Sequence, residues 1–130
     1  PQAVEVCSLA CLPTGDLLLA GYASGEVRLL HTQHTMAMPI ATLSGSIELI
    51  VIAESAPFAI IASLAGEVLV LDLQLMKPRG EVLKAPAGLI SHAWLSSEYL
   101  ALGSCEGHLL TLHPRTMQQV TIDLNHGVPC

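Results

Sequence analysis

Apolar residues recur along this 130-residue chain in three units that are 41 positions apart. A glycine followed by a run rich in valine and leucine occurs at 25–30, again at 66–71 and again at 107–112. A second column keeps the same spacing, because a large apolar residue follows a turn-like cluster at Leu17, Phe58 and Tyr99. Self-similarity at one fixed period is the signature of a repeat architecture.

Within each unit the apolar runs are short, and turn residues interrupt them about every eight to twelve positions, which is typical of an all-β protein. The three glycines at 25, 66 and 107 are expected in tight hairpins that need a positive φ. Proline and glycine predict loops at 76–80 and 85–88. The polar stretch 32–38 is expected to be a third loop. Each unit is expected to hold four strands, at 4–12, 17–23, 26–31 and 40–43; at 47–53, 58–64, 67–73 and 81–84; and at 89–95, 99–105, 109–113 and 119–124.

This pattern resembles the WD40 repeat, whose unit is four strands in about 40–45 residues. The resemblance lies in the turn at 12–15, the run at 18–25 and the segment Val27–His31. The second unit keeps the aspartate of the terminal dipeptide as Asp72 and replaces its tryptophan by Leu71. In the other two units a histidine takes the position of this aspartate, and no Gly-His dipeptide opens a unit. The hydrogen-bonded Trp-Ser-His-Asp network of the family therefore cannot form.

The resemblance implies that residues 1–130 are part of one β-propeller domain, with four-stranded antiparallel blades at about 4–46, 47–88 and 89–127. Known propellers have roughly four to eight blades, so three blades form an incomplete ring. Blades stack on their neighbours because a single sheet cannot bury both of its faces. Neighbouring blades are therefore expected partners of this chain.

The composition fits surfaces that are meant to be covered. Apolar residues make up 52% of the chain and charged residues 12%, against about 25% charged in ordinary soluble domains. The most apolar stretch, 47–66, is disfavoured as a membrane span because it contains Glu48, Glu54 and Pro57. Buried strands explain it better, and no membrane association is expected.

One repeat column carries His31, Asp72 and His113, which together suggest a metal site. Successive units place these residues on separate sheets, whereas ligands must converge on one ion. Polar strand ends that bond to water or to the backbone are the better interpretation. The sequence predicts neither a metal nor an organic cofactor.

The cysteines at 7, 11, 105 and 130 form no Cys-x-x-Cys pair. Cys7 and Cys11 point the same way on one strand but lie about 13 Å apart along it, too far for a disulfide. We expect reduced thiols and a cytoplasmic or nuclear protein. Cys105 is expected in a turn, as a tolerated small residue rather than a reactive one.

No catalytic constellation is present, so an enzyme is not expected. The segment 103–107, Gly-Ser-Cys-Glu-Gly, differs from the Gly-x-Ser-x-Gly elbow of hydrolases and lies in a hairpin turn. No phosphate-binding loop occurs. Five basic residues against eleven acidic ones disfavour nucleic acid, and the cluster of Lys77, Arg79 and Lys84 is expected to be a solvated edge.

The function predicted is a non-catalytic scaffold segment that mediates protein–protein interaction within a larger intracellular assembly. The binding residues cannot be named, but candidate contact loops are those at 44–46 and 85–88 and the turns near Ser24, Ala65 and Glu106. Two alternatives remain open. The blades are purely structural and pack against another chain, or they belong to a ribonucleoprotein scaffold with its RNA contacts elsewhere.

Overall fold

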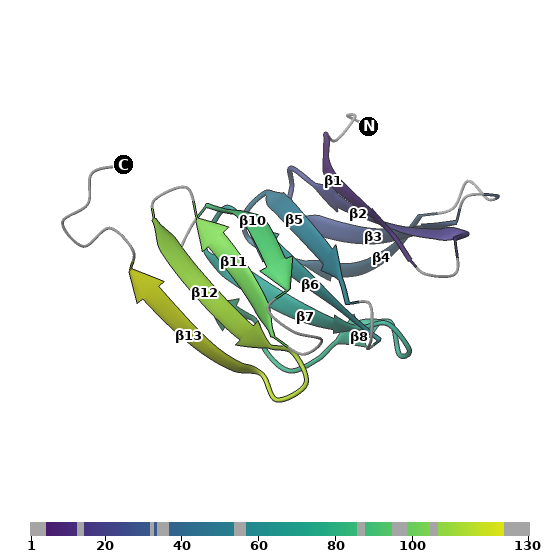
Figure 1. The fold of residues 1–130 in the computed structure, drawn as a ribbon. Helices are drawn as coiled ribbons and strands as arrows, with labels where there is room; N and C mark the ends of the chain where they lie inside the picture. The colour runs from purple at the N-terminus through teal and green to yellow at the C-terminus, as the bar shows by residue number, and fades with distance from the viewer. Residues whose placement is uncertain are drawn as a thin grey trace.

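The computed structural model describes residues 5–12, 15–31, 33, 37–53, 57–85, 88–94, 99–104 and 107–123. These residues form three antiparallel sheets that stand side by side, with no helix among them (Figure 1). The sheets do not close on one another. Within these ranges no helix is long and apolar enough to cross a membrane.

The first sheet has the strand order β1-β2-β3-β4, with each strand beside the next in the chain. Its strands are β1 (Val6–Cys11), β2 (Leu17–Tyr22), β3 (Glu26–His31) and β4 (Ala37–Thr42). The fourth strand begins three residues earlier than predicted and includes Pro39. Proline is accepted because β4 is an edge strand and the ladder is irregular between Val27 and Arg28, opposite that proline.

The second sheet corrects the sequence prediction more strongly. Its strands are β5 (Ile47–Ile52), β6 (Phe58–Ser63), β7 (Glu67–Asp72), β8 (Lys77–Pro78) and β9 (Leu83–Lys84). The predicted loop at 76–80 was wrong at residues 77–78, because β8 pairs there with the end of β7 at Asp72. β9 pairs with the other end of β7, at Glu67, so two short pieces replace the single strand expected at 81–84.

The third sheet has the order β10-β11-β12-β13. Its strands are β10 (Leu89–Trp94), β11 (Leu100–Ser104), β12 (His108–His113) and β13 (Gln118–Asp123). Apart from the fourth strands of the first two sheets, the predicted bounds agree with the structure within two residues. The predicted strand ends at 4, 95, 105 and 124 lie outside the described residues.

The turns repeat as well as the strands. Gly25, Gly66 and Gly107 have φ values of 94°, 82° and 88°, which confirms the predicted positive-φ hairpins. Met76 and Met117, again 41 residues apart, are left-handed too, with φ values of 53° and 65°. The period in the sequence is therefore a period in backbone geometry.

The core lies between the sheets, in two layers. One layer fills the space between the first and second sheets, around Leu19, Ile61 and Leu71. The other fills the space between the second and third sheets, around Ile60 and Leu102. All six residues of β6 are buried, because this strand has a neighbouring sheet against each of its faces.

Candidate functional site

Each sheet turns equivalent residues toward the next sheet, and we call this side its forward face. Leu17 and Val27 on the first sheet pack toward the second, and Phe58 and Val68 on the second pack toward the third. The equivalent residues of the third sheet are Tyr99, Leu109 and Thr111, and Val120 lies opposite Thr111 on β13. No described residue of another sheet covers this forward face, where Tyr99 is 44% and Val120 is 59% exposed.

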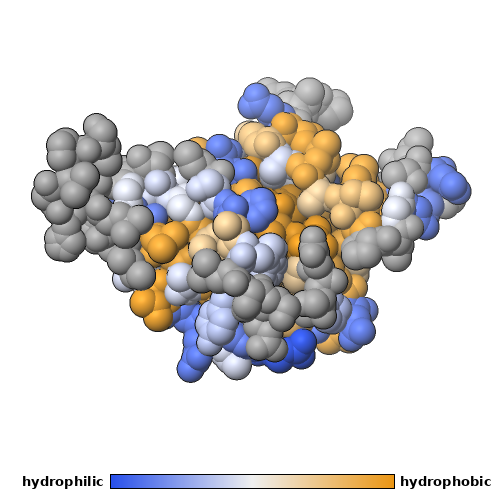
Figure 2. Space-filling model, viewed as in Figure 1, coloured by the Kyte–Doolittle hydropathy of each residue, from blue (hydrophilic) through white to orange (hydrophobic). Residues whose placement is uncertain are grey.

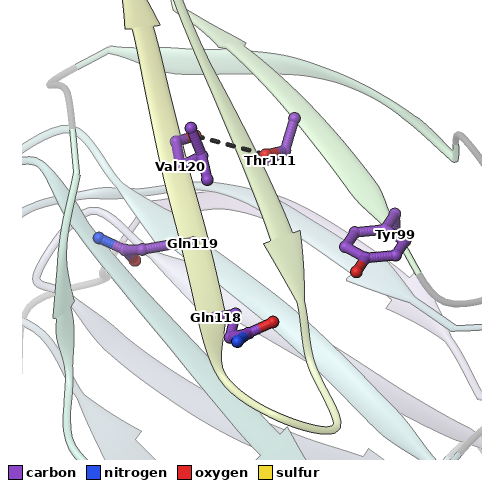
Figure 3. A pocket seen from close by; sticks show the side chains of 5 residues that line it. All are labelled: Tyr99, Thr111, Gln118, Gln119 and Val120. Carbon is purple, nitrogen blue, oxygen red and sulfur yellow. Dashed lines mark hydrogen bonds between the residues drawn. The ribbon is translucent and has the colours of Figure 1, made fainter.

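The forward face of the third sheet carries a hollow of about 430 Å³, lined by Tyr99, Thr111, Gln118, Gln119 and Val120 (Figure 3). Thr111 and Val120 are opposite each other on β12 and β13, and Thr111 Oγ1 donates a hydrogen bond to the Val120 carbonyl at 3.4 Å. The Tyr99 ring meets His113 edge-on, with centroids 4.8 Å apart. Gln119 is anchored toward the second sheet, because its Nε2 donates to the Lys84 carbonyl at 3.0 Å.

The described lining of this hollow is mixed in character. Its lining combines an aromatic ring, a branched aliphatic side chain, a hydroxyl and two amides. Among the residues that the structure describes, this lining has no carboxylate, imidazole or thiol. Apolar residues also gather on the surface over β12 and β13, and a larger apolar area lies over the first and second sheets (Figure 2). The forward face of the third sheet is therefore a candidate docking surface.

The opposite face of the first sheet is polar at its centre. The Nη2 of Arg28 lies 3.1 Å from both carboxylate oxygens of Glu26. The same guanidinium lies over the Tyr22 ring, 5.2 Å from its centroid. This arginine is thus partnered twice within its own sheet.

The column of His31, Asp72 and His113 turns out to cap the turns that follow β3, β7 and β12. His31 Nδ1 accepts a hydrogen bond from the Gln33 backbone at 3.1 Å, and His113 Nδ1 accepts one from Thr116 at 3.3 Å. At the equivalent position of the second sheet, Asp72 Oδ1 accepts hydrogen bonds from the backbone N–H groups of Gln74 and Leu75, at 2.9 and 3.1 Å. The predicted backbone-bonded strand ends are confirmed. Within the described residues no group of three potential ligands surrounds a metal position.

Glu67 secures the linker between the first and second sheets. Its Oε1 accepts hydrogen bonds from the backbone N–H groups of Ser44 and Gly45, at 2.9 and 3.3 Å, and from Ser63 Oγ at 2.8 Å. Desolvation works against ionisation of the carboxyl, but the hydrogen bonds from Ser63, Ser44 and Gly45 outweigh it and lower the pKa of Glu67. The predicted contact loop at 44–46 is therefore engaged by the second sheet.

Other predicted site residues have structural surroundings. Ser104 Oγ accepts a hydrogen bond from the His108 backbone at 3.0 Å, as expected of a turn residue. Cys7 and Cys11 are free thiols and both are exposed, so the prediction that they do not bond to each other is confirmed. The expectations for Cys105, Glu106, Cys130 and the loop residues 86–87 fall outside the described residues.

A basic cluster was missed because its members are far apart in the sequence. Arg79, which follows β8, stacks over Phe58, and Arg115, in the turn after β12, stacks over the same ring. The sequence had grouped Arg79 with Lys77 and Lys84 at a solvated edge. No spacing in the sequence pointed to Arg115, because it lies in the turn after β12, whereas the ring that it stacks on begins β6.

Comparison with known proteins supports the arrangement of the sheets. No family model matches the chain, and no curated protein matches it. Among solved structures, the crystal structure of the computationally designed Ika8 protein is similar over 92% of this chain, with a TM-score of 0.76 and 12% sequence identity. This chain covers 36% of the chain of that designed protein. At such low identity the likeness concerns the fold alone.

Proposed function

We propose that this chain is a non-catalytic protein-interaction scaffold whose three sheets are WD40-like blades of a larger β-propeller. The observation that carries the proposal is the repetition of one interface. The forward faces of the first and second sheets are each sealed by the next sheet, through positions 41 residues apart. The third sheet presents the same face with a hollow and two exposed large side chains.

The occupant of that face is a further sheet of the same pattern. In both existing interfaces, the side that meets a forward face is a rear face built of alternating apolar residues. On the third sheet it consists of Leu100, Leu102, Leu110 and Leu112. A further sheet with this alternation would cover Tyr99 and Val120 as the third sheet covers Phe58. The free thiols of Cys7 and Cys11 support an assembly in the cytoplasm or nucleus, where disulfides are rare.

Self-association of the 130-residue chain tests this proposal. Among the described sheets, the rear face of the first has no covering sheet. It is polar at Arg28 and Glu26 but apolar at Leu18 and Leu30, which are opposite each other, so a second copy can bring this face against the forward face of the third sheet. Sedimentation velocity over a range of concentrations is expected to show reversible head-to-tail association. The double variant Tyr99→Ser, Val120→Ser is expected to weaken this association at least tenfold.

Leu75→Ser is the matched control, because Leu75 is 66% exposed but lies in the turn after β7, away from that face. It should leave the association constant unchanged. A wild-type chain that stays monomeric and unfolds cooperatively would show that the forward face needs no further sheet. Equal weakening by Leu75→Ser would show that association is non-specific.

A further inference from the structure

Arg79 and Arg115 lie together where the second and third sheets meet. We propose that they form a binding site for an oxyanion carried on a peptide, either a side-chain carboxylate or a phosphate. This site goes beyond the proposed scaffold role, and it is separate from the open forward face of the third sheet. It holds whether or not a further sheet covers Tyr99.

The two guanidinium groups converge on one buried ring. The Cζ atoms of Arg79 and Arg115 lie 5.0 and 5.6 Å from the centroid of Phe58. Phe58 itself is 4% exposed, so the ring is a fixed neighbour that both cations share. Stacking on an aromatic face favours arginine, but it does not neutralise the charge.

Arg79 is held in place by a second contact. Its Nη2 donates a hydrogen bond to the backbone carbonyl of Arg115 at 2.6 Å, which ties the segment after β8 to the turn after β12. The Nε of Arg79 is buried and has no hydrogen-bond partner among the described residues. The Nε of Arg28 is buried and unpartnered in the same way, so this atom alone does not distinguish Arg79 from Arg28.

The described part of the chain supplies no counter-charge to this pair. Its ion pairs are Arg28 with Glu26 and His31 with Asp16, and neither Arg79 nor Arg115 takes part in one. Arg28 shows what the chain does elsewhere: an arginine stacked on an aromatic ring is given a carboxylate at 3.1 Å. Two like charges beside one ring, without such a carboxylate, repel each other, and an anion bound to either of them lowers that repulsion.

The geometry suits an oxyanion because guanidinium groups present planar forks of N–H donors that match carboxylate and phosphate oxygens. Arg115 is exposed, so its donors are open to a partner. The formal net charge of −6 argues against a long polyanion, which would meet repulsion beyond this spot. A single acidic or phosphorylated side chain on a peptide meets only the local positive charge.

The test is a titration of the full chain with short peptides, in which the Nε–H signals of the arginines are monitored by NMR. The probes are a capped Gly-Glu-Gly-Glu-Gly peptide, the same peptide with phosphoserine in place of glutamate, and the same peptide with glutamine. We expect at least one of the two charged peptides to shift the signals of Arg79 and Arg115, and the glutamine peptide to shift neither. The charged peptide that shifts them identifies the source of the oxyanion.

Arg115→Gln is expected to weaken binding of that peptide about tenfold or more, which corresponds to the loss of a charge-assisted hydrogen bond. Arg115→Lys keeps the charge but loses the fork, so it should restore only part of the affinity. Arg28→Gln is the matched control, because it removes an arginine that also stacks on a ring but already has its carboxylate. It should leave peptide binding unchanged.

Several outcomes would overturn the site. If Arg115→Gln lowers the urea midpoint but neither charged peptide shifts the arginine signals, the two arginines only cover Phe58. Inorganic phosphate that binds as tightly as the phosphopeptide, or an RNA oligonucleotide that binds more tightly than either peptide, would exclude a peptide as the ligand.

Discussion

Phe58 and Tyr99 occupy the same position in successive sheets, and their surroundings differ sharply. Phe58 is 4% exposed, with a guanidinium from its own sheet and another from the third sheet over its ring. Tyr99 is 44% exposed, and its ring meets His113 of its own sheet. The difference shows what a neighbouring sheet contributes to this fold, because the residues themselves are alike in size and kind.

The same contrast continues along the two forward faces. Val68 and Val70 on β7 are fully buried, whereas Leu109 and Thr111, their equivalents on β12, are only partly buried. The outer residues of the third sheet also become more polar, with threonine in place of valine. The forward face of the third sheet is therefore both less buried and less apolar than that of the second.

The largest effect is expected from truncating the two aromatic residues. Phe58→Ala removes a buried ring and should lower the free energy of unfolding by about 3–5 kcal/mol. Tyr99→Ala should cost about 1 kcal/mol or less, because the ring already meets water. Urea unfolding of the two variants measures the difference. If Phe58→Ala does not fold, Phe58→Leu, with an expected cost of about 1 kcal/mol, replaces it.

Equal costs for the two aromatic truncations would show that Phe58 gains nothing from the third sheet. The contrast between a covered and an uncovered forward face would then fail.

A methyl group added to a glycine sharpens the comparison. A Cβ at Gly21 would collide with the Ile47 side chain of the second sheet, whereas a Cβ at Gly103 would meet only Ser91 Oγ, at 2.7 Å. Gly21→Ala should therefore destabilise by about 1–3 kcal/mol. Gly103→Ala should be close to neutral, since the serine side chain can turn away and alanine restricts the unfolded chain.

Thermal or urea unfolding of both glycine variants provides the measurement. The native protein supplies its own reference, because Ala62 stands at the equivalent position of the second sheet and is fully buried. A Gly103→Ala variant that is destabilised as much as Gly21→Ala would mean that something already packs against the third sheet.

The smallest effect concerns the linkers. Because the pKa of Glu67 is lowered on folding, its contribution to stability is present above the ordinary value of 4.5 and is lost as the pH falls below it. Glu67→Gln should cost about 1 kcal/mol at neutral pH and should flatten the loss of stability on acidification below about pH 5. Ser63→Ala should show the same change more weakly, because it removes one hydrogen bond to the Glu67 carboxylate and leaves the two from the backbone.

Urea unfolding at several pH values between 3 and 7 would reveal this dependence. At the next linker the equivalent residue is His108, and the sequence there contains Pro86, which lacks an N–H group. His108→Gln is therefore expected to leave the acid limb of stability unchanged. An acid limb that survives Glu67→Gln unaltered would contradict the role of that carboxylate.

Much of the fold could be predicted because its rules are local. The period of 41 residues placed the hairpin glycines, and the apolar runs placed the strands within two residues in most cases. The predictions failed at the edge strands, where Pro39 and Pro78 lie within pairing segments. Proline marks a loop when the sequence is considered alone, but an edge strand leaves one side without a partner and so tolerates it.

The site was harder to predict because its contacts join distant positions. Arg79 and Arg115 are 36 residues apart, and the sequence grouped the first with its neighbours in the chain. The role of Glu67 was also hidden, because its backbone partners Ser44 and Gly45 are 23 and 22 residues away in the sequence. The contacts of Glu67 and of the two arginines depend on how one sheet packs against the next, and no local sequence pattern specifies that packing.

The sequence by itself determined the repeat, the strands, the turn glycines and the column of turn-capping residues, because backbone sterics and alternation act over a few residues. The tertiary structure alone decided which faces are covered, which linker Glu67 holds and where the two arginines meet. Identical local patterns can be buried or exposed, since burial is set by the sheet that stands opposite. That is why Phe58 and Tyr99, equivalent in the sequence, have such different surroundings.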